Sequence, residues 1–421
     1  MTHPPAVRGF CPGARRPMMS GDGLIVRLRP PAGRLSLTDA HLIALKALEF
    51  GNGRLDVTRR AGLQIRGARP DSLPDLTRAL DAAGLLDADV TSEAARSLIV
   101  PPLAGCDPDA ALDAGPLISA LEARMATHAA FRGLPPKLGT LLDDGGRADL
   151  SATRADIRLE ALAPGRIRVG LDGAAGPDWL GTAPPARIPD ILTALAGAIA
   201  RAQPPEGRAR VRTLLAQPGF RPSALAAARA MGLDPAVDPA PRRVRPPLVG
   251  HLALSDGAAL AVIAPFGRIS AEALVHLASL APTGDIRLAP EHGLIRTGLA
   301  PETARQAVRA LSPAFITRAA DPLLSVTACA GRPDCASAHA DVRTVARAVA
   351  PFARRLGPGV SVHVSGCAKG CARDAPARLT ATATPDGFAL IPHGRADGVA
   401  TAHVASSAEL AAHLLALGDR P

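Results

Sequence analysis

The feature that most constrains the fold of this chain is an internal repeat. Residues 22–35 resemble residues 256–269, which lie 234 positions later, and residues 62–67 resemble residues 293–298, which lie 231 positions later. In each copy, apolar alternation and turn signals predict a strand, a turn, a helix and two further strands, which is half of a split βαβ unit. Two such halves, far apart in the sequence, are predicted to pair across a pseudo-two-fold axis into one central sheet.

The first copy shows the predicted elements most clearly. A strand is predicted over Leu24–Arg29, with Arg27 and Arg29 on one face, and a second strand over Arg54–Thr58 follows a glycine-rich turn. A helix is predicted to begin near Ser36, a residue type that caps helix N-termini. The apolar side of this helix is predicted to consist of Leu42, Ile43, Leu45 and Leu48.

Two longer segments flank the second copy and are predicted to form α/β lobes. In the later segment, buried strands are predicted over Leu323–Thr327 and Val360–Val364, with a helix over Ala336–Ala350 between them as a βαβ crossover. The proline-rich stretch 235–247 is the predicted linker. The chain is therefore divided into 1–75, 76–240, 248–310 and 311–421, and the fold class is α+β.

Composition narrows the classes of partner. Hydrophobic residues make up 47% and charged residues 20%, which is typical of a soluble globular protein. The sequence has no apolar run near the ~20 residues that span a bilayer and no signal-peptide pattern at its start, so a cytoplasmic location without a membrane partner is expected. The net charge of +10 indicates either a polyanionic partner or a general use of arginine at the surface. Nucleic acid is not expected, because aromatic residues are only 2% and no dense basic block occurs.

Four of the six cysteines predict a metal centre. Cys329 and Cys335 follow one predicted strand, and Cys367 and Cys371 follow the next. Adjacent parallel strands end at the same sheet edge, so both loops should meet there. Four thiolates suit a [4Fe–4S] cluster or zinc, and the five-residue spacing of the first pair favours the cluster. The two remaining cysteines, Cys11 and Cys106, are predicted to be buried packing residues.

The cysteine pattern resembles that of sulfite and nitrite reductases, in which the fourth cysteine, here Cys371, also bridges the cluster to a sirohaem iron. Within that superfamily the chain is most similar to the precorrin-3B synthase family of aerobic cobalamin biosynthesis, over residues 11–13, 17–18, 20–24, 51–53, 58–67 and 363–371. The resemblance implies duplicated ferredoxin-like half-domains with two flanking lobes, the C-terminal one holding the cluster. Members of this family hydroxylate precorrin-3A and form a γ-lactone, using dioxygen and an electron donor.

The same resemblance assigns substrate-binding residues. Arg60 lies at the position of an arginine that binds macrocycle carboxylates, and Arg96 at that of a second anion-binding arginine, although Ser97 follows it where the family usually has asparagine. Lys137 is kept, but Gly139 replaces a second lysine of the sulfite reductases, which argues against reduction of a small anion. The further predicted binding residues are Arg27, Arg29, Gln64 and Arg66.

The second copy lacks this cationic set. Its equivalent positions hold Ala261, Ile263, Glu291, Ile295 and Thr297. A single polyanion site near the first copy is therefore predicted, within electron-transfer reach of the cysteines. The arginines would bind the carboxylates of a tetrapyrrole substrate.

The predicted function is an oxygen-dependent hydroxylation and lactonisation of precorrin-3A to precorrin-3B, with a [4Fe–4S] cluster as cofactor. A further iron or sirohaem stays open, and no residue is assigned to oxygen activation. Electrons are expected from a partner protein or a small donor, because no glycine-rich dinucleotide motif follows a strand. The alternatives are a sirohaem-dependent sulfite or nitrite reductase and a zinc-stabilised module that binds nucleic acid.

Overall fold

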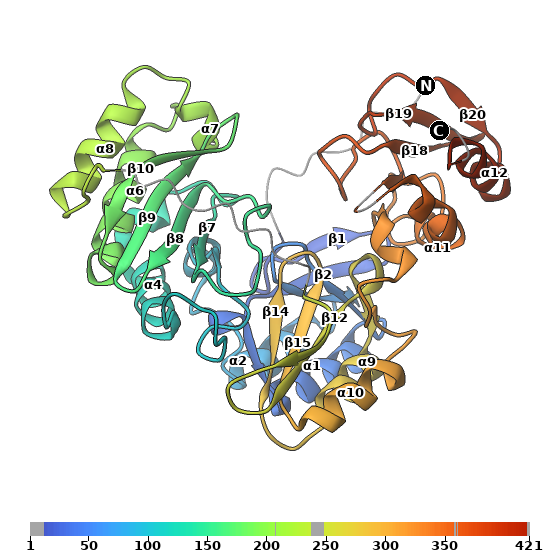
Figure 1. Cartoon of the computed structure of the whole chain (residues 1–421), viewed down its shortest axis with the longest axis horizontal. Helices are drawn as coiled ribbons and strands as arrows, with labels where there is room; N and C mark the ends of the chain where they lie inside the picture. Colours follow the sequence, from blue (N-terminus) through green and yellow to red (C-terminus); the bar gives the residue numbers. More distant parts are fainter. Residues whose placement is uncertain (1–11, 207, 237–247, 358, 360, 419–421) are drawn as a thin grey trace.

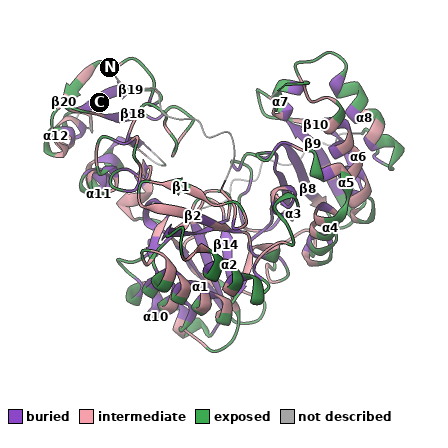
Figure 2. Ribbon diagram, turned by 180° about the vertical axis from the view of Figure 1, so that it is seen from behind, coloured by how far each residue is buried: buried purple, intermediate pink, exposed green. Residues whose placement is uncertain are grey.

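The computed structural model describes residues 12–206, 208–236, 248–357, 359 and 361–418. Two lobes rise as the arms of a V from a central core that contains both repeat copies (Figure 1). Buried residues concentrate on the strands and on the inner faces of the helices (Figure 2). Within the described part of the chain, none of the helices is long and apolar enough to span a membrane.

The two repeat copies contain the same elements in the same order. The first copy comprises β1 (Met18–Ser20), β2 (Gly23–Leu28), β3 (Arg34–Ser36), α1 (Leu37–Phe50), β4 (Arg54–Val57), β5 (Leu63–Ala68) and α2 (Leu73–Ala82). The second comprises β11 (Gly250–Ala253), β12 (Ala258–Ile263), β13 (Arg268–Ser270), α9 (Ala271–Ala278), β14 (Asp285–Ala289), β15 (Gly293–Leu299) and α10 (Pro301–Ala310). The predicted α+β class with duplicated ferredoxin-like half-domains is confirmed.

The copies exchange one strand each. One sheet has the order β1-β2-β5-β4-β13 and the other β11-β12-β15-β14-β3, so each five-stranded sheet is completed by a short strand of the other copy. Arg268 pairs with Asp56 where β13 meets β4, and Arg34 pairs with Arg287 where β3 meets β14. We call these two strand pairings the seam. The prediction of a single central sheet is therefore wrong in this detail, because the two copies form two sheets, each with one strand of the other copy.

The helices of the two copies begin at equivalent serines. Ser36 forms a capping box with Asp39 at the start of α1, and the Ser270 hydroxyl accepts a hydrogen bond at the start of α9. The predicted apolar side of α1 is wrong for Leu45 and Leu48, whose exposed fractions are 56% and 49%. The buried stripe is instead made by Ala40, Ile43, Ala44 and Ala47. Three of these four residues are alanines, so the face of α1 that packs into the core carries mainly short side chains.

The two lobes also share a topology. In the first lobe the order is β10-β9-β8-β7-β6, and in the C-terminal lobe it is β16-β17-β18-β19-β20. In each, the first three strands along the chain run parallel and the last two antiparallel. The duplication therefore extends over both lobes, beyond the half-domains in which the sequence revealed it.

The lobes have the following bounds. The first lobe contains α3 (Val90–Ala95), β6 (Leu98–Ile99), α4 (Gly115–Thr127), α5 (Ala129–Arg132), β7 (Thr140–Asp143), β8 (Ile157–Ala163), β9 (Arg166–Asp172), β10 (Pro177–Ala183), α6 (Ile188–Arg201), α7 (Val211–Leu214) and α8 (Phe220–Ala230). The C-terminal lobe contains β16 (Val326–Ala328), α11 (Val342–Ala353), β17 (Val362–Ser365), β18 (Leu379–Thr384), β19 (Gly387–Pro392), β20 (Ala402–Val404) and α12 (Ser407–Gly418).

The predicted βαβ crossover in the C-terminal lobe is confirmed, because β16 and β17 pair in parallel with α11 between them. Its elements begin later than the sequence suggested. A 3-10 turn over Pro322–Ser325 precedes β16, and α11 begins only after its cap Asp341. The residues after Cys335 form a loop that returns to the sheet edge, with the His339 amide donating to Gly366. Cys11 and 237–247 of the predicted linker lie outside the described residues.

The buried carboxylate of Asp56 at the seam should make the free energy of unfolding depend on pH. Asp56 is almost buried and receives two hydrogen bonds from Arg268, at 2.7 and 2.9 Å. Burial alone would raise the pKa of Asp56, but Arg268, Arg343 and Arg66 outweigh it and hold the pKa below its ordinary value of 3.8. A carboxylate with a depressed pKa stabilises the folded state fully above its unfolded-state pKa. That contribution is lost as the pH falls through the lower folded-state value.

We therefore expect Asp56→Asn to lower the free energy of unfolding by about 3 kcal/mol at pH 7. The variant should also lose part of the decline in stability that the natural chain shows below about pH 4. Urea denaturation at several pH values measures both effects. Asp75→Asn is the control, because its ion pair with Arg78 is exposed to solvent and should be worth less than about 1 kcal/mol. Equal loss in the two variants would contradict the role given to the seam.

Candidate functional site

The four clustered cysteines lie in two loops at one edge of the C-terminal sheet. Cys329 follows β16 directly, and Cys367 follows β17 after one glycine. Ala328 pairs with Val364 in the parallel ladder, so both strands end at the same level. The predicted meeting of the two loops is confirmed. That the thiols bind a cluster stays a prediction.

The thiols are close enough to influence one another. The Gly366 amide donates a hydrogen bond to Cys329 Sγ at 3.2 Å, and a Cβ on Gly366 would lie only 3.3 Å from the same sulfur. Burial raises the pKa of Cys329, and the neighbouring thiols Cys335 and Cys367 raise it further. Burial likewise raises the pKa of Cys371. Such thiols lose their protons to solvent when they bind a metal cation, which is how metal binding and thiol ionisation are coupled.

These residues fit an iron–sulfur cluster. A [4Fe–4S] cluster is held by four cysteine thiolates. Two loops that each supply two thiols, with a glycine against one sulfur, match that requirement.

A loop of the first half-domain reaches the cysteines. Arg59, between β4 and β5, donates from Nη1 to the carbonyl oxygen of Ala372 at 2.9 Å, and Ala372 directly follows Cys371. The same guanidinium forms two hydrogen bonds with Glu291 of the second copy, at 2.9 and 2.8 Å. The hydrogen bonds with Glu291 are the main cause that raises the pKa of Arg59. The 58–62 loop is thus fixed between the second copy and the cysteine loop.

On the first-copy side, the structure brings four of the predicted binding residues into one pocket. Arg27, Arg29, Arg60 and Arg96 all line it, and we call it the arginine pocket. Arg27 pairs with Gln64 across β2 and β5, and the Gln64 amide oxygen accepts from Arg27 Nε and Nη2 at 3.2 and 3.0 Å in the amide orientation that satisfies both groups. Gln64 therefore orients one wall of the pocket.

Arg60 occupies space that Gly139 leaves open. Its Nη1 donates to the Arg154 carbonyl oxygen at 2.7 Å, and a Cβ on Gly139 would overlap its Nη2. The departure from the reductase lysine pattern at Gly139 thus has a structural counterpart, because any side chain there would displace Arg60. Lys137 is exposed and is not among the residues that line the arginine pocket.

The predicted binding residues Arg96 and Arg66 bind carboxylates of the chain itself. Arg96 binds Asp87 at 2.7 Å and Glu122 at 3.1 Å, and these partners offset its charge within the pocket wall. Arg66 lies outside the arginine pocket and binds Asp22 at 2.6 Å near the seam. Sequence spacing placed Gln64 and Arg66 on one strand, but it does not reveal which acidic side chains surround each of them.

The equivalent face of the second copy has a different character. It lines a hollow of about 740 Å³ between the core and both lobes. Ile263, Glu291 and Ile295 stand there in place of Arg29, Arg60 and Gln64. Three cationic or polar groups of the first copy are thus replaced by two apolar residues and a carboxylate, so the two faces would attract different ligands.

His363 is a buried polar residue that the sequence analysis did not single out. It lies in the middle of β17, it is fully buried, and neither ring nitrogen has a hydrogen-bond partner in the described part of the chain. Burial, followed by the charges of Arg373 and Arg59, lowers the pKa of His363 from 6.5 to about 4. A histidine between two valines, four residues before Cys367, was the available signal.

Comparison with known proteins supports the same family as the sequence motifs. The family model of the nitrite/sulfite reductase ferredoxin-like half domain matches residues 16–83. The structure of the NirA protein of Mycobacterium tuberculosis covers 93% of this chain and 79% of its own, with a TM-score of 0.74 and 23% identity. A ferredoxin-dependent sulfite reductase of Mycolicibacterium paratuberculosis is 24% identical over 83% of this chain and 68% of its own length.

A stronger match comes from a precorrin-3B synthase of a Sinorhizobium species, which is 34% identical over 94% of this chain and 85% of its own length. The chain belongs to the precorrin-3B synthase family. The resemblance found from the sequence motifs is confirmed, and so is the prediction that this protein is an oxidoreductase. The sulfite and nitrite reductases are more distant relatives of this family member, so the reductase alternative is not favoured.

The buried imidazole of His363 should also make the stability of the protein depend on pH. Its folded-state pKa lies below that of the unfolded chain, so unfolding takes up a proton between about pH 4 and pH 6.5. The stability of the metal-free protein should therefore fall by up to about 3 kcal/mol as the pH drops from 6.5 to 4. His363→Leu should remove this dependence and stabilise the protein by about 1 kcal/mol at pH 7, because it removes a buried group without a partner.

Urea denaturation of metal-free protein measures both quantities. His276→Gln, on an exposed position of α9, is the control and should keep the pH profile of the natural chain. A loss of about 2 kcal/mol or more in His363→Leu at pH 7 would mean that the imidazole has a partner in the folded protein.

Proposed function

We propose that this chain converts precorrin-3A to precorrin-3B by oxygen-dependent hydroxylation at a meso carbon with formation of a γ-lactone. Its family membership supports the reaction. The observation that carries the proposal is the position of the arginine pocket, whose Arg60 is adjacent to Arg59, the residue that binds the loop after Cys371. The 58–62 loop would then connect a polyanion site with an electron-carrying centre.

The arginine pocket would bind the carboxylates of the tetrapyrrole. A guanidinium presents two parallel N–H groups to a carboxylate, which orients the ligand as well as attracting it. Arg27, Arg29 and Arg60 would serve in this way, with Gln64 holding Arg27. The charge of Arg96 is offset by Asp87 and Glu122, which bind it.

The cysteines Cys329, Cys335, Cys367 and Cys371 would hold a [4Fe–4S] cluster. Hydroxylation places one oxygen atom of dioxygen on the substrate and releases the other as water, which requires two electrons and two protons. A cluster held by these cysteines would pass such electrons singly from a donor. The chain's own contribution is to fix the cysteine loop against the substrate site, through Arg59 and the Ala372 carbonyl.

The cofactor proposal is tested by absorption and EPR spectra with metal analysis of protein purified without oxygen. We expect about four irons per chain, a broad thiolate-to-iron band and no sirohaem band. Cys335→Ser and Cys367→Ser should each lose the band, whereas Cys106→Ser, in the first lobe, should keep it. A sirohaem spectrum would support a sulfite or nitrite reductase instead, and zinc without iron would contradict the redox function.

Binding of the substrate class is tested with uroporphyrin, a stable tetrapyrrole that carries eight carboxylates. Arg60→Gln should weaken its binding about tenfold, because it removes one charge-assisted contact worth about 1.5 kcal/mol. Gly139→Ala should weaken binding as well, since the added Cβ displaces Arg60. Fluorescence titration at fixed ionic strength measures the affinity.

Arg78→Gln, on the exposed face of α2, is the matched control and should bind uroporphyrin as the natural chain does. Circular dichroism checks that each variant is folded. Unchanged affinity in Arg60→Gln would move the substrate site away from the arginine pocket.

A further inference from the structure

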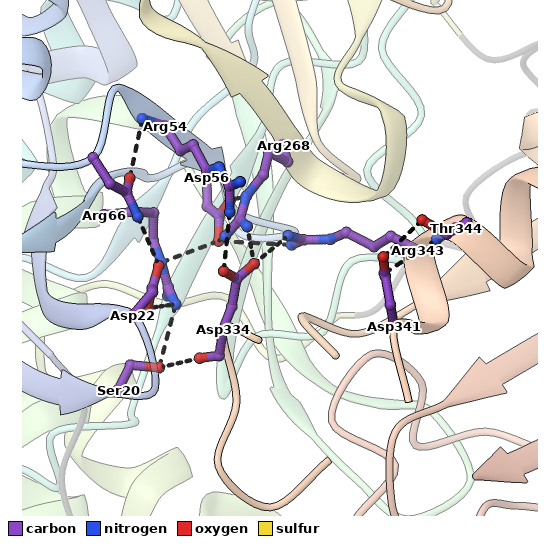
Figure 3. A network of polar contacts seen from close by, with 11 residues as sticks. Ser20, Asp22, Arg54, Asp56, Arg66, Arg268, Asp334, Asp341, Arg343 and Thr344 are labelled. Atoms are coloured by element: carbon purple, nitrogen blue, oxygen red, sulfur yellow. Dashed lines mark hydrogen bonds and ion pairs between the residues drawn. The ribbon is translucent and has the colours of Figure 1, made fainter. Parts of the chain in front are cut away.

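The residue before Cys335 is a buried carboxylate. Asp334 has a side chain only 4% exposed, and three arginines from three different elements bind it. Arg54 Nη1 lies at 3.1 Å and Arg343 Nη1 at 3.3 Å, and Arg268 Nη1 also pairs with it. These arginines come from β4 of the first copy, α11 of the C-terminal lobe and β13 of the second copy (Figure 3).

The main chain at Asp334 is bound as well. Its carbonyl oxygen accepts from Ser20 Oγ at 2.8 Å and from the Gly21 amide at 3.1 Å, at the turn after β1. A Cβ on Gly21 would lie 2.7 Å from the Pro333 carbonyl oxygen, so the approach of the two segments requires glycine. The loop that carries Cys335 is therefore held by side chain and backbone together.

The carboxylate of Asp334 also balances the charges around it. Ion pairs connect four arginines and three aspartates of this network: Arg54, Arg66, Arg268, Arg343, Asp22, Asp56 and Asp334. Figure 3 shows these residues together with Asp341, which bonds to Thr344. Without the charge of Asp334, these arginines would outnumber the aspartates by two in a largely buried place. Uncompensated buried charges destabilise the folded state, so the negative charge of Asp334 stabilises this network.

The other half of the seam shows what the carboxylate adds. Arg34 and Arg287 stand there at the positions equivalent to Arg268 and Asp56. The first lobe meets them with a main-chain carbonyl, because Ala104 O accepts from Arg34 Nη2 at 2.6 Å and from Arg287 Nη1 at 2.9 Å. The seam thus has two equivalent docking positions, and in the C-terminal lobe a side-chain carboxylate fills the one beside the cysteines.

We propose that Asp334 is the positioning residue for Cys335. Its carboxylate binds the seam arginines and fixes the 329–335 loop before any cluster is bound, so that the thiol of Cys335 is already in place. This inference rests on the proposed function in one respect, that Cys335 is a cluster ligand. The fixing of the loop itself does not depend on the cluster.

The test is hydrogen exchange measured on the full chain, both metal-free and cluster-loaded. Asp334→Asn should accelerate exchange of the amides of Gly21, Cys335 and Ala338 by about tenfold or more in both forms, because it loosens the loop locally. Asp341→Asn is the matched control, since Asp341 is an exposed aspartate of the same lobe that caps α11. It should leave these three amides unchanged.

A second readout follows the cluster. Iron release to a chelator should be about tenfold faster in Asp334→Asn than in the natural chain or in Asp341→Asn. If Asp334→Asn does not fold, Arg54→Gln replaces it, because Arg54 is 47% exposed and its loss removes one of three partners. A smaller acceleration of the same amides is then expected.

Two outcomes separate the inference from the proposed function. Exchange of the three amides within twofold of the natural chain, in whichever of the two variants folds, would overturn the role of Asp334. Accelerated exchange in metal-free protein that never binds iron would keep the loop-fixing role and reject the cluster.

Discussion

The exchange of one short strand between the two repeat copies is the constraint on which the rest of the structure depends. The β13 strand completes the sheet of the first copy and β3 completes that of the second, so neither copy has its full sheet alone. Both lobes contact the core at this seam, one through the carbonyl of Ala104 and the other through Asp334. The positions of the arginine pocket and of the cysteine loops therefore follow from the same strand pairing.

A symmetric framework carries an asymmetric set of charges. The two halves share their strand order, their helix caps and the topology of their lobes. Their side chains differ where ligands would bind, with Arg60 in one copy and Glu291 in the other, and these two positions lie in loops that meet beside the seam. Arg59 joins them through its ion pair with Glu291, so the second copy supports the site of the first.

Much of the fold could be predicted from local patterns. The repeat, the turn at 51–53 and the cysteine spacing predicted the half-domains and the meeting of the cysteine loops. Leu45 and Leu48 were misplaced because periodicity alone could not show that alanines make the closest packing on α1. The start of α11 was missed because the loop after Cys335 is fixed by a contact with a residue distant in the sequence, the hydrogen bond from the His339 amide to the Gly366 carbonyl oxygen. The lobe duplication left no repeated motif, since it is a topology and not a sequence pattern.

The candidate site was less predictable than the fold, because the availability of an arginine for a ligand depends on which acidic side chains the fold places beside it. Arg27, Arg29 and Arg60 line a pocket, whereas Arg66 is held by Asp22, 44 positions earlier in the sequence. The exchanged strand has a consequence for synthesis on the ribosome. The first half emerges complete except for β13, so β4 keeps an open edge until residues 268–270 have been translated. During that interval the unpaired edge of β4 is exposed to other chains, and it is covered only when β13 of the second copy pairs with it.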